Sequence, residues 1–489
     1  MASNPKVLIA GAGPVGLTLA NELTRRGISV RIVDKNAERT DKSKALVIWS
    51  RTLELFDDAG YAKEFIPAGF AAHGAQISTG KEIVANVTLD SIDSRFNYAL
   101  MIPQSESERV LEEHLAAAGV KVERRTELAG FTDKGTAVEA ALRKEDGSSE
   151  TVGADWLVGC DGAHSAVRHG LGFTFEGSTL ESHWALADGH VSGLEPKDRL
   201  HIFWHRDGIL AFFPIVGDRW RVIADLGPAT GDEKHPDPTL EEINALMALR
   251  GSPGIVMKDP FWLAAFRINE RKVKDYRKGR VFLAGDAAHI HSPAGGQGMN
   301  TGMQDAFNLA WKLGLVIEGA AKPALLDSYS PERSTVGEMV LRNAGRLTEA
   351  ATLRNPIAQG LRNTIVKFAA GFPVLQHMIA NQLSEMDIAY PDSPLTASGA
   401  YSVSGPAAGA RWPDRLPPDA GGTKFTAIGP ADAVAALATK YPKLVVAAPA
   451  TGERAKTLRL IRPDGYVGFA GAASDGVDAE AYLAVLAAG

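Results

Sequence analysis

The feature that most constrains the fold lies at the start of the chain, where a glycine-rich turn joins a strand to a helix. The apolar run Lys6 to Ala10 predicts a strand, and a helical pattern follows until Gly27. Between them stands the pattern G-x-G-x-x-G, formed by Gly11, Gly13 and Gly16. The first glycine permits a tight turn, the second admits a pyrophosphate, and the third packs the helix on the strand. This order predicts an α/β dinucleotide-binding unit.

The identity of the nucleotide is narrowed by the next strand, Ile28 to Val33, which ends at Asp34. A carboxylate at this position accepts hydrogen bonds from both ribose hydroxyls of an adenosine and disfavours a 2′-phosphate. The nucleotide is therefore expected to be FAD or NAD rather than NADP. This motif alone does not choose between FAD and NAD.

A second glycine-rich loop lies far along the chain, in Arg280 to Leu313. Val281 to Ala284 predicts a short buried strand that ends at Gly285-Asp286, and from about Asn300 apolar residues recur at helical spacing. The loop between them is stiffened by Pro293 and contains several glycines. A loop leading into a helix N-terminus presents free backbone N–H groups and the positive end of the helix dipole to an anion. Asp286 suits a sugar or ribityl hydroxyl, because a carboxylate only accepts hydrogen bonds.

The segment GDAAHIHSPAGGQGMNTGMQDA within this stretch closely resembles the second flavin-binding motif of the single-component, class A flavoprotein aromatic hydroxylases. A third segment, Asp155 to Arg168, resembles the same family's aspartate–glycine motif at Asp161-Gly162. The three motifs occur in the order that the family has. The resemblance therefore favours FAD over NAD as the bound nucleotide.

The resemblance covers essentially the whole chain and implies an α/β architecture. It consists of a Rossmann-like FAD-binding fold, an inserted antiparallel β-sheet domain for the substrate and a thioredoxin-like C-terminal domain without cysteine. A length of 489 residues fits about two or three domains. The expected divisions are residues 1–73, 98–175 and 276–388 for FAD, 74–97 and 176–275 for the substrate, and 389–489 for the C-terminal domain.

The motifs and the resemblance together give a set of expected FAD contacts. At Lys44 the family usually has an arginine, so a solvated surface lysine is the alternative at this position. Gln104 and Arg109 resemble a segment in which a glutamine and an arginine reach the FAD. The expected contacts are Gly11, Gly13, Pro14, Val15, Gly16, Asp34, Lys35, Lys44, Gln104, Arg109, Asp161, Gly162, Gly285, Asp286, Pro293, Gly296, Gly298, Met299 and Asn300.

The sequence identifies the catalytic residues less clearly than the FAD contacts. The resemblance implies that Arg168 assists the reduced nicotinamide and that Pro293 lies at the flavin. A substrate phenol needs activation by a base such as histidine. Among the aromatic-rich strands His201 and His205 are the chosen candidates, with His183 as an alternative, whereas His289 and His291 of the flavin loop are expected to be structural.

The family resemblance implies a monooxygenase that consumes NAD(P)H and O2 and hydroxylates a phenolic or polycyclic aromatic substrate through a flavin C4a-hydroperoxide. A flavoprotein oxidase or halogenase-type enzyme on the same scaffold, or a non-catalytic flavin-binding protein, remains an alternative. The Trp-x-Trp-x-Ile-Pro stretch associated with the halogenases is absent from the sequence.

Charge and composition exclude other partners. A net charge of −6 argues against nucleic acid or an anionic membrane, and no apolar run reaches the roughly 18 residues of a membrane span. The single cysteine, Cys160, cannot form an intramolecular disulfide, and the N-terminus runs straight into a strand without room for a signal peptide. We expect a cytoplasmic monomer or homodimer without a metal site.

Overall fold

The computed structural model describes residues 4–41, 43–229, 235–416 and 422–488. The first motif folds as predicted into β1 (Val7–Ala10), α1 (Pro14–Arg25) and β2 (Val30–Val33). Strands β2, β1, β11 (Trp156–Gly159) and β18 (Val281–Leu283) pair in parallel, and β17 (Arg277–Lys278) closes the edge. All three glycine-bearing motifs thus begin at the carboxyl ends of neighbouring parallel strands, where ligands of open α/β sheets bind.

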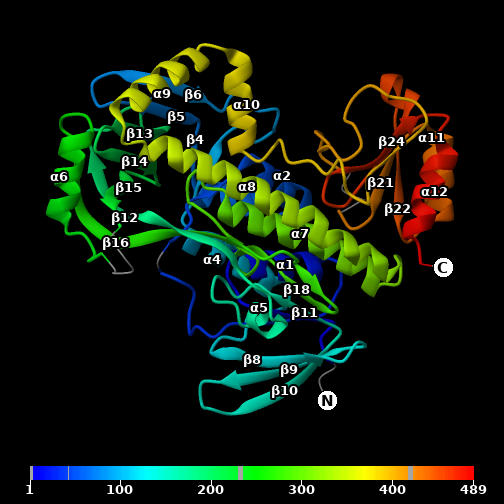
Figure 1. Cartoon of the computed structure of the whole chain (residues 1–489). Coiled ribbons are helices and arrows are strands. Elements are labelled where there is room, and N and C mark those ends of the chain that lie inside the picture. The colour runs from blue at the N-terminus through cyan, green and yellow to red at the C-terminus, as the bar shows by residue number, and fades with distance from the viewer. Residues whose placement is uncertain (1–3, 42, 230–234, 417–421, 489) are drawn as a thin grey trace.

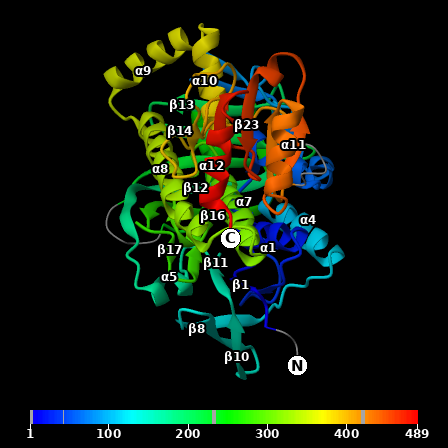
Figure 2. The same ribbon diagram turned by 90° about the vertical axis from the view of Figure 1, so that its right-hand side faces the viewer.

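Smaller elements surround this sheet. Helices α2 (Ser50–Ala59), α3 (Ala62–Phe65), α4 (Gln104–Ala117) and α5 (Ala166–Leu171) belong to this part of the chain. A short sheet is formed by β3 (Val47–Ile48), β7 (Ala99–Met101) and β4 (Phe70–Ala72), and another by β10 (Ser149–Ala154), β9 (Val138–Lys144) and β8 (Thr126–Asp133). The β8–β10 sheet projects at one end of the molecule (Figures 1 and 2).

A separate eight-stranded sheet has the order β19-β16-β12-β15-β14-β13-β5-β6. The strands expected from the aromatic-rich segment are confirmed, and the expectation that residues 74–87 join them is confirmed by the pairing of β5 with β13. The bounds are β5 (Gly74–Ser78), β6 (Ile83–Thr88), β12 (Glu176–Ser192), β13 (Leu200–His205), β14 (Gly208–Pro214), β15 (Arg219–Pro228), β16 (Val256–Lys272) and β19 (His289–Ile290), with helix α6 (Leu240–Arg250).

Two long helices cross the middle of the molecule (Figure 1). α7 (Gly298–Ile317) begins at the flavin-type loop and is buried from Asn300 to Leu315. α8 (Tyr329–Thr352) lies beside it and reaches β14 and β16 of the eight-stranded sheet. α9 (Pro356–Ala369) and α10 (Pro373–Leu383) then return along β6.

The C-terminal part is a five-stranded mixed sheet in the order β20-β24-β23-β21-β22. Figure 2 shows this unit in front of the long helices. The predicted strand–turn–strand around Arg462 to Gly465 is confirmed as β23 and β24. The bounds are β20 (Ala397–Ser398), β21 (Phe425–Gly429), α11 (Ala431–Lys440), β22 (Val445–Pro449), β23 (Thr457–Ile461), β24 (Val467–Ala472) and α12 (Gly476–Leu486).

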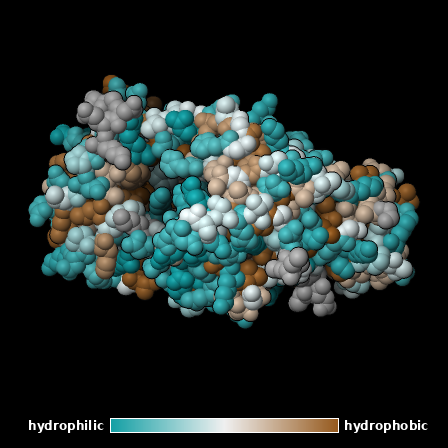
Figure 3. All heavy atoms as spheres, turned by 90° about the horizontal axis from the view of Figure 1, so that it is seen from below, coloured by the Kyte–Doolittle hydropathy of each residue, from teal (hydrophilic) through white to brown (hydrophobic). Residues whose placement is uncertain are grey.

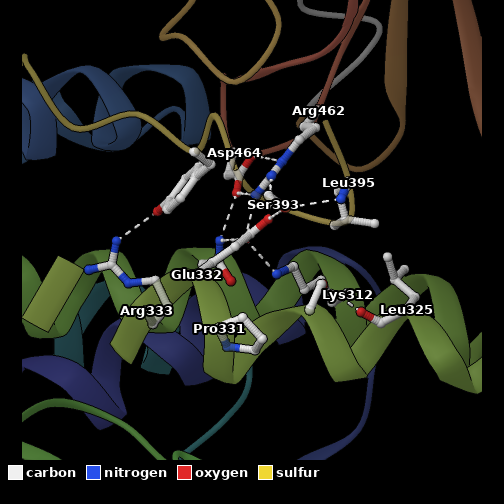
Figure 4. A network of polar contacts seen from close by, with 12 residues as sticks. Lys312, Leu325, Pro331, Glu332, Arg333, Ser393, Leu395, Arg462 and Asp464 are labelled. Atoms are coloured by element: carbon white, nitrogen blue, oxygen red, sulfur yellow. Dashed lines mark hydrogen bonds and ion pairs between the residues drawn. The ribbon is translucent and has the colours of Figure 1, made fainter. Parts of the chain in front are cut away.

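A buried ionic network fastens this unit to α7 and α8 (Figure 4). Arg462 forms a two-pronged pair with Glu332 at 2.7 and 2.9 Å and also contacts Asp464 at 2.6 Å. Lys312 of α7 donates to Glu332 at 2.7 Å. Burial opposes the charge on Glu332, but Arg462 and Lys312 hold the pKa of this carboxyl well below its usual range. The network therefore keeps its charges paired in the interior.

Candidate cofactor-binding and active site

A cavity of about 690 Å³ lies at the carboxyl ends of the parallel strands. Seen from below, the molecule is hollowed between the part that holds the eight-stranded sheet and the centre (Figure 3). The cavity brings together loops from all three motifs and reaches the eight-stranded sheet at Phe213, Arg221 and Ile223. The expected residues that line it are Gly11, Gly13, Pro14, Val15, Asp34, Lys35, Lys44, Gln104, Asp161, Gly162, Asp286, Pro293, Gly296, Gly298 and Met299.

The first glycine loop is shaped by close backbone contacts. Gly11 has φ +100°, and a Cβ there would lie 2.3 Å from the Cys160 carbonyl oxygen, while one at Gly16 would lie 2.0 Å from the Gly11 oxygen. At Gly13, by contrast, a Cβ would meet no described atom within 4 Å. The open space at Gly13 is where the motif admits a pyrophosphate. The Ala12 backbone N–H donates to Asp34 at 2.7 Å, which fixes the carboxylate at the cavity wall.

The aspartate–glycine motif supplies an acceptor without a partner. Asp161 Oδ2 accepts from the Val167 backbone N–H at 3.2 Å, whereas its Oδ1 is buried and has no hydrogen-bond partner in the described part of the chain. A buried unpaired carboxylate oxygen is costly, so this atom marks a place for a ligand hydroxyl.

Arg168 lies behind this motif and does not line the cavity. Its guanidinium donates to the carbonyls of Ala163, at 2.8 Å, and Ala287, at 3.1 Å, and stacks 4.0 Å from the Phe175 ring centre. Burial lowers the pKa of Arg168. The side chain therefore joins the aspartate–glycine motif to the Gly285–Asp286 loop, and its expected role toward the nicotinamide stays a prediction.

The Gly285–Asp286 loop is held by a carboxylate of α7. Asp305 accepts from the Gly285 backbone N–H at 3.0 Å and contacts His289 at 2.8 Å and Arg333 at 2.6 Å. Burial opposes its ionisation, but Arg333 and His289 together lower the pKa of Asp305. Gly285, with φ +62°, packs under Val15. His289 is thus structural, as its motif position suggested.

Asn300, in the first turn of α7, also acts behind the cavity wall. Its side-chain oxygen accepts from the Trp49 N–H at 2.8 Å, and its amide donates to the carbonyls of Val47 and Gly296. Gly16, Gly285 and Asn300 therefore shape the wall without lining the cavity. Gly298 and Met299, at the start of α7, do line it, and the first backbone N–H groups of a helix have no partner within the helix.

Lys44 faces the cavity. Its neighbour Arg221 is a cavity residue that the sequence analysis did not identify. The Lys44 carbonyl accepts from Arg221 at 3.1 Å, and Arg221 forms a two-pronged buried pair with Asp188 at 2.8 and 2.9 Å. Arg221 thereby links the eight-stranded sheet to the cofactor loop. Burial raises the pKa of Asp286, and the charge of Lys44 partly offsets that effect. The sequence signal that could have identified Arg221 is the presence of an arginine within the apolar run of β15.

Three expected residues lie elsewhere. Arg109 faces outward from α4, where it pairs with Glu106 and Glu113. His201 is buried on Trp220, and its Nε2 lies 2.8 Å from the Pro196 carbonyl. His205 accepts from the Asp207 backbone N–H, and burial lowers the pKa of both histidines. Neither histidine lines the cavity.

Gln104 lies at the cavity wall, where its side chain accepts from the Ala45 N–H at 3.2 Å and donates to Glu108 at 2.9 Å. His291, expected to be structural, also lines the cavity. Its Nδ1 lies 2.8 Å from the Ser292 carbonyl, and burial lowers its pKa to about 4, so the ring is neutral.

The residues present fit FAD. The glycine turn leaves space at Gly13, Asp34 stands where the adenosine ribose is recognised, and Asp161 offers an unpaired acceptor. The start of α7 provides backbone N–H groups for the electron-rich end of a flavin. No group of three or more potential metal ligands occurs among the described residues. Within the same residues, no helix has both the length and the apolar surface that crossing a membrane requires.

The fold and this cavity define a flavoprotein of the FAD-binding α/β type. A family model described as FAD binding domain matches residues 4–344. The 6-methylpretetramide 4-monooxygenase of Streptomyces rimosus is 38% identical over 403 residues, covering 81% of this chain and 72% of that protein. Pentachlorophenol 4-monooxygenase of Sphingobium chlorophenolicum is 35% identical, covering 83% and 75% respectively.

Among solved structures, an anhydrotetracycline hydroxylase from Streptomyces rimosus matches with a TM-score of 0.82 and 30% identity, and the match covers 100% of both chains. The chain therefore belongs to the family of FAD-dependent aromatic monooxygenases.

Proposed function

We propose that this monooxygenase uses NAD(P)H and O2 to hydroxylate a phenolic or polycyclic aromatic ring. FAD, when bound, takes electrons from the nicotinamide and activates dioxygen for transfer of one oxygen atom. The observation that carries the proposal is the continuity of the cavity, which runs from the nucleotide-binding turn at Gly13 to Phe213 and Ile223 of the eight-stranded sheet. An aromatic ring held at that sheet would meet the flavin end of the cavity.

The chain's own residues have distinct roles in this proposal. Gly11, Gly13 and Asp34 bind the adenosine and pyrophosphate part, and Asp161 accepts from a cofactor hydroxyl. The start of α7 at Gly298 would favour negative charge on a flavin bound here, because the first N–H groups and the positive end of a helix dipole lie at a helix N-terminus. Pro293 stiffens the loop before α7, which lines the cavity.

The names of the relatives support the substrate class. One relative is named for a tetracyclic precursor and another for a chlorinated phenol, so the shared element is an oxygen-bearing aromatic ring. We propose residues 1–73, 98–175 and 276–388 as the FAD-binding domain, 74–97 and 176–275 as the substrate domain, and 389–489 as a thioredoxin-like domain. A cytoplasmic location as a monomer or homodimer completes the proposal.

The test is oxygen-dependent oxidation of NADH and NADPH by the purified yellow protein, with and without a panel of phenols, followed by product mass spectrometry. We expect one or more phenols to stimulate oxidation and to gain the mass of one oxygen atom. Peroxide as the sole product with every ring would support an oxidase instead. Failure of either nicotinamide to reduce the flavin would support a non-catalytic flavin-binding protein.

A further inference from the structure

The outer surface of α9 and α10 is apolar although it faces solvent. Among the described residues, nine of the nineteen exposed large apolar side chains lie between positions 357 and 379. On α9 they recur at the spacing of one helix face, and α10 continues the pattern. We call this surface the α9–α10 face. Its most exposed members, each at least 56% exposed, are Ile357, Leu361, Ile365, Phe368, Val374 and Met378.

The inner side of α9 is polar, which reverses the usual pattern of a surface helix. Gln359 and Arg362 are buried there. The Gln359 amide donates to the Arg206 carbonyl at 3.2 Å. Arg362 donates to the Ala350 carbonyl at 2.8 Å, and its guanidinium lies 4.1 Å from the Trp204 ring centre. Polar groups are thus satisfied inside while apolar side chains remain in water, so the outer face is built to be covered.

The apolar side chains of the two helices form one continuous surface. The rings of Phe368 and Phe372, at the junction of α9 and α10, lie 4.8 Å apart between their centres. Both helices pack on β6, and His377 Nδ1 of α10 lies 3.0 Å from the Ser91 carbonyl oxygen. Both views show α9 at the opposite end of the molecule from the β8–β10 sheet (Figures 1 and 2). The face is therefore fixed to the body of the protein and open on its outer side.

The size of the face matches one half of a dimer interface. At roughly 60–120 Å² of apolar surface for each side chain, the exposed fractions of the nine amount to roughly 300–600 Å². A standard interface buries about 800 Å² on each partner, of which about 56–65% is apolar. An interface with two-fold symmetry uses the same patch on both copies. One such face on each copy therefore supplies the apolar area that a stable dimer needs.

The charges around the face favour a second copy over a lipid surface. Residues 350–384 contain no Asp or Glu, and Arg354 and Arg362 are engaged within the chain. A helix that lies on a membrane displays Lys and Arg on its polar side, whereas Arg362 is buried. Lys367, next to Phe368 in the chain, pairs with the exposed Glu82 at 3.4 Å. A two-fold axis can place Lys367 of one copy beside Glu82 of the other, so these charges are self-complementary.

We propose that the α9–α10 face binds the same face of a second copy of this chain, so that the protein is a two-fold symmetric homodimer. The inference selects one of the two assembly states named above and assigns its interface. It does not rest on the proposed hydroxylation, because no residue of the face lines the cofactor cavity.

The first test measures the mass of the FAD-loaded full chain by analytical ultracentrifugation over a wide range of protein concentrations. We expect a species of twice the chain mass that dissociates on dilution. Leu361→Asp and Phe368→Asp each place a carboxylate in the interface and should raise the dimer dissociation constant at least about tenfold. The FAD content of each variant shows that it has folded.

Val477→Asp is the matched control, because Val477 is 81% exposed on α12, on the far side of the molecule in Figure 1. We expect this variant to keep the wild-type dissociation constant. A wild-type chain that is monomeric at every concentration overturns the inference. Equal dissociation constants in the face variants and the control variant overturn it as well.

Cross-linking tests the location without placing a charge on the face. The chain's single cysteine, Cys160, is buried, so a cysteine introduced at the surface supplies the accessible thiol. Leu361→Cys and Ile365→Cys are treated with a bis-maleimide, which joins two thiols through thioether bonds. We expect covalent dimers from at least one of these variants and none from Val477→Cys. Equal yields from all three variants, or no cross-linked dimer, contradict the assigned interface.

Vesicles distinguish a lipid surface from a second copy. Flotation of a monomeric chain with phosphatidylcholine vesicles, lost in Phe368→Asp, would assign the face to lipid and overturn the inference. Product masses separate this inference from the proposed function. Ring oxygenation by a monomer refutes only the homodimer, whereas a dimer that yields no oxygenated product refutes only the proposed hydroxylation.

Discussion

The two cavities of the molecule differ in the groups that line them. The larger one is lined in part by the backbone of glycine turns, as at Gly11, where a Cβ would lie 2.3 Å from the Cys160 carbonyl oxygen. The smaller one, of about 270 Å³, lies between α8 and strands β12, β15 and β16, and the side chains that line it include Glu270 and Thr348. A backbone-lined site recognises a constant ligand and tolerates few substitutions, whereas a side-chain-lined site can change its ligand by single substitutions.

The largest effect is expected from a substitution at a glycine turn of the larger cavity. Gly13→Val is expected to abolish FAD retention, because the side chain enters the open space at the pyrophosphate position while meeting no described protein atom. The measurement is the ratio of flavin to protein absorbance after purification, with circular dichroism to confirm folding. Gly360→Val, at an exposed glycine of α9 with equally open surroundings, is the control. A normal flavin content in Gly13→Val would show that the turn does not hold the cofactor.

The next effect concerns the network that supports both cavities through α7 and α8. Arg462→Met leaves Glu332 and Asp464 without their shared cation, and removal of one partner of a buried pair costs about 3–5 kcal/mol. Denaturant unfolding measures the loss. Arg454→Met removes an exposed pair with Asp414 and should cost less than about 1 kcal/mol. Similar losses in the two variants would mean that the C-terminal unit is held by apolar contacts alone.

A smaller effect is expected within the cofactor cavity. Asp161→Asn replaces one carboxylate oxygen, either the unpaired Oδ1 or Oδ2, by an amide donor. A cofactor hydroxyl therefore loses a charged acceptor. The expected cost is about 1.5–3 kcal/mol, or roughly ten- to a hundredfold in the FAD dissociation constant. Fluorescence titration of the apoprotein with FAD measures it. An unchanged constant would assign Asp161 to the turn alone, through its bond to the Val167 N–H.

A pH dependence of stability is expected to act through α7. Glu385 accepts from Thr301 and Gln304 in the first turns of that helix, and burial raises its pKa to about 8. The folded chain therefore holds a proton that the unfolded chain releases above about 4.5. Stability should fall as the pH rises from about 4.5 to about 8 and then level off.

Glu385→Gln should flatten this slope, since an amide does not titrate. Thermal unfolding across the same pH range measures the difference between the two proteins. Glu338→Gln, at an exposed position of α8, should keep the wild-type slope. Identical slopes in wild type and Glu385→Gln would place the titration elsewhere.

The contrast between the cavities also explains how much the sequence could predict. Gly13, Asp34, Asp161 and Asp286 were identified because each motif positions its residues through neighbours in the chain. Arg221, in contrast, reaches the cavity only through the register of β15 against β12. The smaller cavity needs α8 packed against the sheet, and no local pattern encodes that contact. The outward turn of Arg109 is likewise decided by its i,i+3 and i,i+4 acidic partners on α4.

The smallest expected effect tests the histidine that sequence reasoning placed in the reaction. His205 belongs to β13, accepts from the Asp207 N–H and lines neither cavity, so His205→Asn should change kcat by less than about threefold. A general base removed from the reacting proton typically costs about 10²–10⁴-fold. A loss of that size, with normal FAD content and unfolding, would mean that β13 moves toward the flavin when substrate binds. Strand β13 would then form part of a cavity wall only in the substrate-bound protein.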